Sequence, residues 1–154
     1  MSTERILVHS SIAADFRAIL KRTIDRIFSS VEATPMLVTK GSADRNRSLV
    51  EDAISKGASP LNVFGESQTG EHEKIATRMR PVVLTDVDPN MDLYKGESFG
   101  PSVSLFTFDT EKEALELANN TDYGLSASVF TEDLRAGFRF AEGLDSGAVH
   151  INTM

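Results

Sequence analysis

Residues 103–151 read VSLFTFDTEKEALELANNTDYGLSASVFTEDLRAGFRFAEGLDSGAVHI, and strand and helix patterns alternate along them. Apolar runs at 103–108, 125–130 and 147–151 predict three strands. Two helical patterns separate these strands, so the whole alternation occupies fewer than 50 residues. Strands joined by helical crossovers run in the same direction and pair in parallel. The stretch therefore predicts an α/β fold with a mostly parallel sheet.

The two helices of this stretch are indicated by their first residues and their spacing. Thr110 and Glu113 form a Thr-x-x-Glu capping box, in which both side chains accept hydrogen bonds from backbone N–H groups at the helix start. Leu134, Phe138 and Ala141 recur at the spacing of a second helix.

The alternation continues toward the N-terminus. Residues 5–9 hold three consecutive apolar residues, which predict a buried strand. Ser11 stands where a helix N-cap is expected. Apolar residues then recur at helical spacing, at Ile12, Phe16, Ile19, Leu20, Ile24 and Ile27.

A second helix is expected from about Asp44 to Lys56, ended by Gly57 in a conformation that a Cβ would disfavour. Its inward-facing residues are expected to be Leu49, Val50, Ala53 and Ile54. Residues 61–64 indicate a strand, and the polar residues 65–78 indicate a loop or short insertion. Residues 79–84 are apolar again, and Pro81, which has no N–H, belongs at a strand start or on an edge.

Length and charge limit the possible functions. The chain of 154 residues suits one domain, residues 1–154. A net charge of −7 argues against binding to nucleic acid or to an anionic membrane surface, because both would repel the chain. No apolar run approaches the roughly 18 residues of a membrane span, and the first residues lack the order of a signal peptide. We therefore expect a cytoplasmic protein.

Searches for catalytic and metal-binding motifs find little. The sequence has no dinucleotide-binding glycine motif, no P-loop and no cysteine, so a thiolate metal site is excluded. His9, His72 and His150 are too scattered to predict a metal site. For His9 and His150 we expect a structural role, and for His72 a solvent-facing one.

One turn favours a functional interpretation, Lys95-Gly96-Glu97-Ser98-Phe99-Gly100-Pro101. Read structurally, Gly100 and Pro101 set the backbone of a tight turn, and Glu97 is solvated. Read functionally, the turn holds a carboxylate and an aromatic ring against a ligand. A carboxylate suits a ribose, because it accepts hydrogen bonds from both vicinal hydroxyls. The residues alone leave both interpretations open.

Several segments in order resemble the aldehyde dehydrogenase superfamily. Residues 97–101 match its E-x-F-G-P motif, and residues 79–84 resemble the stretch ahead of that motif. Residues 118–130, ANNTDYGLSASVF, resemble A-N-x-T-x-Y-G-L-x-A-x-V-F, and residues 147–152 resemble the strand G-x-V-x-x-N. Residues 2–6 are similar to the segment that follows the family's nucleophile.

The resemblance implies roles for particular residues. Glu97 would bind the nicotinamide ribose of NAD(P), and Phe99 would pack against the nicotinamide ring. Gly100 and Pro101 would shape the turn that presents both. By contrast, Gly124 and Asn152 are interpreted as structural, at a turn and at a strand end, and Thr153 and Met154 would approach the wall of the aldehyde site.

The resemblance also implies what lies outside the chain. The nucleophilic cysteine would precede Met1, with the general base and the cofactor domain further upstream. The chain thus resembles a truncated, C-terminal part of a three-layer α/β catalytic domain, with no catalytic residue of its own and no metal site. The parent would oxidise an aldehyde to a carboxylic acid with NAD(P), and the sequence leans toward the branch acting on vanillin or salicylaldehyde.

A second hypothesis is a non-catalytic binding or interaction module that keeps the same fold. For the chain as it stands, without a nucleophile, this is the favoured interpretation. The chain alone is expected to be inactive, to bind NAD weakly or not at all, and to form homo-oligomers.

Overall fold

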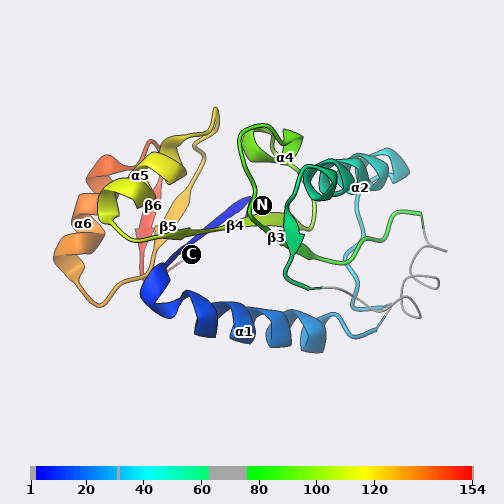
Figure 1. Cartoon of the computed structure of the whole chain (residues 1–154), viewed down its shortest axis with the longest axis horizontal. Coiled ribbons are helices and arrows are strands. Elements are labelled where there is room, and N and C mark those ends of the chain that lie inside the picture. The colour runs from blue at the N-terminus through cyan, green and yellow to red at the C-terminus, as the bar shows by residue number, and fades with distance from the viewer. Residues whose placement is uncertain (1–2, 31, 63–75, 154) are drawn as a thin grey trace.

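The computed structural model describes residues 3–30, 32–62 and 76–153 (Figure 1). The elements are β1 (Arg5–His9), α1 (Ser10–Ile27), α2 (Lys40–Ser55), β2 (Ser59–Pro60), β3 (Val82–Thr85), α4 (Asp92–Lys95), β4 (Ser102–Phe108), α5 (Glu111–Asn119), β5 (Ala127–Val129), α6 (Leu134–Gly143) and β6 (Val149–Ile151). The expected polar loop at 65–78 lies outside the described residues except for its last three positions. His72 also lies outside them.

The strands form two sheets. The larger has the order β1-β4-β3-β2, in which β1 and β3 run parallel to β4 and the short β2 runs antiparallel to β3. The smaller consists of the parallel strands β5 and β6. The α/β class and the mostly parallel pairing are confirmed.

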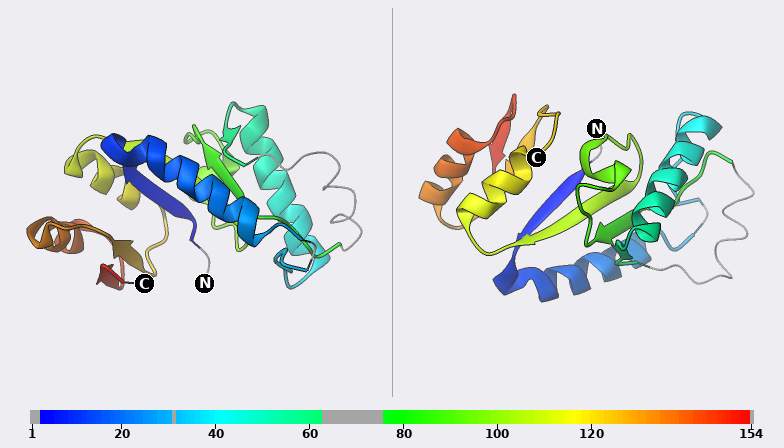
Figure 2. Two further views of the ribbon diagram at one scale, coloured as in Figure 1. Left: turned by 90° about the horizontal axis from the view of Figure 1, so that it is seen from below. Right: turned by 45° about the horizontal axis from the view of Figure 1, so that its top comes forward.

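The pairing of β4 differs from the sequence expectation. Parallel pairing holds between β5 and β6, but β4 pairs with β1 and β3 and not with β5. The reason is burial on both faces: Leu105 and Phe106 are buried on opposite sides of β4, which requires a central place between two other strands. Figure 2 shows β5, β6 and α6 set to one side of the larger sheet.

The larger sheet lies between two layers of helices. Successive side chains of a strand point to opposite faces, so Leu105 packs with Val83 and Ile24 of α1. Phe106 packs on the other face with Leu84 and with residues of α2 and α4. Figure 1 shows α1 along one face of the sheet and α2, α4 and α5 on the other, which confirms the three-layer arrangement.

The start of α1 is capped by His9 and not by Ser11, contrary to the sequence expectation. The His9 Nδ1 accepts from the Ser11 N–H at 3.2 Å, and the Ser11 Oγ lies 2.8 Å from it. The His9 ring also stands edge-on to Phe108, with ring centroids 5.4 Å apart. An imidazole nitrogen accepts as a hydroxyl does, so His9 fills the capping position from the strand end. A structural role for His9 is confirmed.

Both long helices bury fewer of the expected residues. On α1, Phe16, Leu20 and Ile24 face the sheet, but three other apolar residues are exposed: Ile12, Ile19 and Ile27. On α2, Ile54 is exposed as well, and the helix begins at Lys40, earlier than expected, with the Thr39 hydroxyl as its cap. Its buried face is formed by Ala43, Asn46, Val50 and Ala53. A small and a polar residue belong to that face, which apolar spacing alone did not reveal.

Other local expectations are confirmed with small shifts. Gly57 has φ +111°, and Pro81 directly precedes β3. The strand expected at 61–64 is displaced to Ser59–Pro60, because those residues pair with Thr85 and Leu84. Residues 63 and 64 lie outside the described residues.

The capping box of α5 is also confirmed in modified form. The Thr110 Oγ1 accepts from the Glu113 N–H at 3.2 Å. The Glu113 carboxylate accepts from the Asp109 N–H at 2.8 Å, one residue before the cap. Within the described part of the chain, no helix is long and apolar enough to cross a membrane.

Candidate functional site

The turn at 96–101 joins α4 to the start of β4 and presents two side chains. Phe99 has φ +50°, and 74% of the residue's surface is exposed. Glu97 is partly exposed, and among the described residues its carboxylate has no hydrogen-bond or salt-bridge partner. The backbone of the turn, by contrast, is bound on two sides. The two residues that the sequence singled out thus lie together on a held turn with their side chains unengaged.

From the β1 side, Glu4 binds the N–H groups of the turn. One carboxylate oxygen accepts from the Ser98 N–H at 3.1 Å. The other lies 3.1 Å from the Ser98 Oγ and accepts from the Phe99 N–H at 3.3 Å. One side chain therefore holds two consecutive amides and a hydroxyl, a role that no local sequence pattern predicts.

From the α2 side, two side chains bind the carbonyl groups of the same residues. Arg45 donates to the Glu97 carbonyl at 3.0 Å and to the Ser98 carbonyl at 3.1 Å. Asn46 donates to the Ser98 carbonyl at 2.9 Å. Donors on one side and an acceptor on the other thus fix both polar groups of Ser98.

Asn46 is the buried centre of this arrangement, with 1% of its surface exposed. Its Nδ2 also donates to the Ser42 carbonyl at 3.1 Å, and its Oδ1 accepts from the Ser102 hydroxyl at 2.9 Å. Asn46 thereby connects α2 to the turn and to the first residue of β4. Its polar groups are satisfied, as a buried amide requires.

The hydrogen bonds are strong enough to hold Phe99 in its unusual conformation. A left-handed backbone costs a residue with a Cβ on the order of 1–2 kcal/mol. A hydrogen bond to a charged group contributes about 1.5–3 kcal/mol, and Glu4 accepts at both Ser98 and Phe99. Non-glycine residues in this conformation concentrate at ligand-contacting positions, which favours the functional interpretation of the turn.

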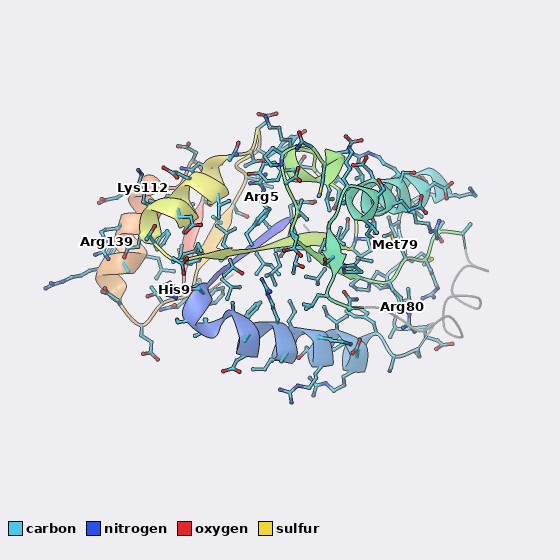
Figure 3. All side chains as sticks on the ribbon, in the orientation of Figure 1. Arg5, His9, Met79, Arg80, Lys112 and Arg139 are labelled. Atoms are coloured by element: carbon cyan, nitrogen blue, oxygen red, sulfur yellow. The ribbon has the colours of Figure 1, made fainter. Side chains whose placement is uncertain are left out.

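Arg5 connects β1 to α4 and to the end of α5. Its guanidinium donates to the carbonyl oxygens of Leu117 at 2.7 Å and Asn120 at 2.9 Å, at the end of α5, and to that of Tyr94 in α4. It also lies over the Tyr94 ring, 4.7 Å from its centroid. Burial lowers the pKa of this guanidinium, while Tyr94 acts in the opposite direction. Figure 3 shows Arg5 on the α4 and α5 side of β1.

The second group of motif residues is structural, as expected. A Cβ on Gly124 would stand 2.3 Å from the Asp145 carbonyl oxygen, so this position is closed to any side chain. Asn152 has φ +56°, and its amide exchanges two hydrogen bonds with the Thr131 backbone, at 2.9 and 3.0 Å. Thr153 is exposed, and Met154 lies outside the described residues.

In residues 3–30, 32–62 and 76–153, no group of three His, Asp or Glu side chains could hold a metal ion. The third histidine of the sequence search, His150, lies within β6. The chemistry on offer at the turn is that of a carboxylate and an aromatic ring.

Comparison with known proteins assigns the chain to a family. The model of the aldehyde dehydrogenase family matches residues 1–154. The chain belongs to the aldehyde dehydrogenase family. The family resemblance of the E-x-F-G-P turn and of the following segments is thereby confirmed.

Relatives in the family act on different aldehydes. The chain is 35% identical over 157 residues to the benzaldehyde dehydrogenase YfmT of Bacillus subtilis (strain 168), covering 99% of this chain and 31% of that protein. It is 37% identical over 156 residues to a chloroplastic betaine aldehyde dehydrogenase of Atriplex hortensis, covering 98% and 30%. Vanillin and salicylaldehyde dehydrogenases are also among the matches, as the sequence resemblance implied.

The fold matches solved structures of the family. An NAD-dependent benzaldehyde dehydrogenase from Corynebacterium glutamicum matches with a TM-score of 0.83 at 28% identity, over 100% of this chain and 32% of that one. The chain thus spans about 31% of the length of the curated relatives it matches.

Proposed function

We propose that Glu97 and Phe99 bind the nicotinamide riboside half of NAD(P). The observation that carries this proposal is the contrast within one turn. The backbone is bound by Glu4, Arg45 and Asn46, whereas the Glu97 carboxylate and the Phe99 ring remain available. A turn held this firmly presents its two side chains without further ordering, which lowers the entropic cost of binding.

The chemistry of the two side chains suits this half of the cofactor. A carboxylate accepts hydrogen bonds from both ribose hydroxyls, and an exposed aromatic ring packs against the flat nicotinamide. When bound, NAD(P) accepts a hydride from the substrate. The residues of this chain would orient the ring that receives it, and an NAD-dependent relative is consistent with this cofactor.

We propose further that the whole protein oxidises an aldehyde to a carboxylic acid. The relatives named for benzaldehyde and for betaine aldehyde have similar sequence identities to the chain, 35% and 37%. We therefore propose aldehydes as the substrate class, with aromatic aldehydes as the preferred branch. The chain has no cysteine, and covalent aldehyde oxidation needs a thiolate. For these 154 residues alone, a non-catalytic binding module is therefore the favoured function.

Nicotinamide mononucleotide tests the cofactor proposal, because it is the half of NAD that would contact the turn. Titration followed by amide shifts should perturb Glu97 and Phe99, with a dissociation constant in the millimolar range, which corresponds to about 4 kcal/mol. Glu97→Gln should weaken this binding, and Glu51→Gln on the exposed side of α2 should leave it unchanged. Shifts spread evenly over the surface, or equal binding in both variants, would contradict the proposal.

We also propose that the chain self-associates, acts as one domain and resides in the cytoplasm. Several large apolar side chains are exposed, including Val38, Leu125 and Phe130, and exposed apolar surface favours association. β1 is an edge strand, and β5 and β6 form a pair with open edges. Light scattering of the chain at about 100 μM should give a dimer or a larger species. Salt at about 0.15 M screens charges that lie more than roughly 8 Å apart, so the net charge of −7 should not prevent association. A monomer would contradict the first proposal, and cell fractionation tests the last.

A further inference from the structure

We infer that Glu4 is the positioning residue that holds Phe99 in its left-handed conformation and so sets the direction of its ring. This inference rests on the proposed function of the turn in cofactor binding. It assigns to a residue of β1's N-terminal flank a role in a site that lies 95 positions away in sequence.

The hydrogen bonds to the turn come from two sides, from α2 and from Glu4. Arg45 and Asn46 bind the carbonyl oxygens of Glu97 and Ser98. Among the described residues, Glu4 is the one that accepts from the Phe99 N–H. The hydrogen bonds from α2 therefore reach the turn as far as Ser98, and Glu4 supplies the hydrogen bond to the next residue, Phe99.

The backbone of Glu4 is itself fixed, which makes its side chain a suitable support. The Ser104 N–H donates to the Glu4 carbonyl at 3.0 Å, so Glu4 continues the ladder between β1 and β4. Glu4 is thus bonded to β4, the strand that directly follows the turn. The carboxylate spans from that ladder to Ser98 and Phe99 with both of its oxygens engaged.

Removing the acceptor should release the strained residue. A residue with a Cβ prefers negative φ, so only surrounding contacts keep Phe99 at φ +50°. Without the Glu4 carboxylate, the Phe99 N–H loses its partner and φ returns to negative values. The Cβ then changes direction, and the ring moves away from its present position.

The test uses the 154-residue chain and nuclear magnetic resonance. In Glu4→Ala we expect the amide protons of Ser98 and Phe99 to exchange at least about tenfold faster, the effect of losing a charge-assisted hydrogen bond. The coupling between the Phe99 amide and α protons should change as well. Glu4→Gln keeps one acceptor oxygen and should give intermediate exchange. Glu51→Gln, which removes a carboxylate elsewhere, should change neither, and the Leu105 amide in β4 serves as the internal reference for folding.

Two results would overturn the inference. One is an unchanged Phe99 coupling and unchanged exchange in Glu4→Ala, because Arg45 and Asn46 would then suffice. If Leu105 also exchanges faster in Glu4→Ala, that variant has lost its fold, and Glu4→Gln decides in the same way. The other is an altered Phe99 coupling together with undiminished binding of nicotinamide mononucleotide, since Glu4 would then not matter to the site.

Binding at about 10 mM nicotinamide mononucleotide separates this inference from the proposed function, since a millimolar ligand is largely bound at that concentration. We expect shifts at Glu97 and Phe99 in the wild-type chain and smaller shifts in Glu4→Ala. If the wild-type chain shows no shifts at Glu97 and Phe99, the nicotinamide proposal is refuted, and with it the role of Glu4 in cofactor binding. The exchange and coupling data would then report separately on whether Glu4 holds the backbone of Phe99.

Discussion

The side chain of Asn46 occupies the space that a Cβ on Gly100 would need. Such a Cβ would stand 2.2 Å from the Asn46 Oδ1 and 2.4 Å from its Nδ2. Asn46 has no free space to move into, because it is buried and its amide binds both Ser98 and Ser102. The glycine of the turn is therefore required by a residue of α2, more than 50 positions earlier.

Gly100→Ala should consequently destabilise the chain. Forcing a methyl group into a filled interior costs typically about 1–3 kcal/mol, and urea unfolding would measure the loss. Gly41→Ala is the matched control, because its nearest neighbour would stand 3.8 Å away and it lies within α2. The Gly41→Ala substitution should be neutral or stabilising, since alanine favours a helix by about 0.5–1 kcal/mol over glycine. Equal effects of the two substitutions would show that the contact with Asn46 is unimportant.

Arg5→Lys should destabilise the packing of α4 and α5 on β1. The planar guanidinium reaches three carbonyl groups at once, and a lysine ammonium lacks that fork. We expect a loss of about 1.5–3 kcal/mol, the range for one hydrogen bond to a charged group. Arg22→Lys, at an exposed position of α1, is the control and should have no measurable effect. Thermal unfolding of both variants compares them directly. Similar unfolding midpoints would argue against a stabilising role for the hydrogen bonds of Arg5 to α4 and α5.

The ion pair between Glu111 and Arg139 should contribute to stability only above acidic pH. Arg139 binds both carboxylate oxygens, at 2.8 and 2.5 Å, and this hydrogen bonding lowers the pKa of Glu111 below its ordinary value near 4.5. Because the folded-state pKa is depressed, the stabilisation is present above pH 4.5 and is lost as the pH falls through the folded-state value.

A double-mutant cycle with Glu111→Gln and Arg139→Gln measures this coupling. The coupling should be detectable at pH 7 and decline as the pH falls through the lowered folded-state pKa of Glu111, and salt should weaken it because the pair is exposed. Lys112 and Glu116, which are more exposed and 3.7 Å apart, provide a comparison pair with little expected coupling. Coupling between Glu111 and Arg139 that does not decline as the pH is lowered would contradict the assignment.

The chain alone should not oxidise aldehydes. It has no cysteine, so it cannot form the covalent intermediate from which a hydride leaves. Incubation with NAD and either benzaldehyde or propanal, followed by NADH absorbance, should match a buffer blank. Turnover that survives repurification would mean that another side chain acts as nucleophile.

Local spacing predicted most elements but not always their faces. The helical pattern of α1 was right, yet Ile12 and Ile19 are exposed while Phe16 is packed against the sheet. Both sets share helical periodicity, and only the position of the sheet distinguishes them. The expectation that Ile54 of α2 faces inward was wrong for the same reason, since Asn46 completes the buried face of that helix. A polar residue carries no apolar signal even where it is buried.

The sequence by itself determined the α/β class, the order of strands and helices, the capping of α5 and the turn that carries Glu97 and Phe99, because each of these depends on residues within a few positions of one another. Only the tertiary structure decided that β4 lies between β1 and β3 and that Glu4 and Asn46 hold the turn. Those contacts join residues separated by 94 and 52 positions. A hydrogen bond depends on distance in space, and no local pattern reports which distant side chain the packing of the sheet will bring to the Ser98 backbone.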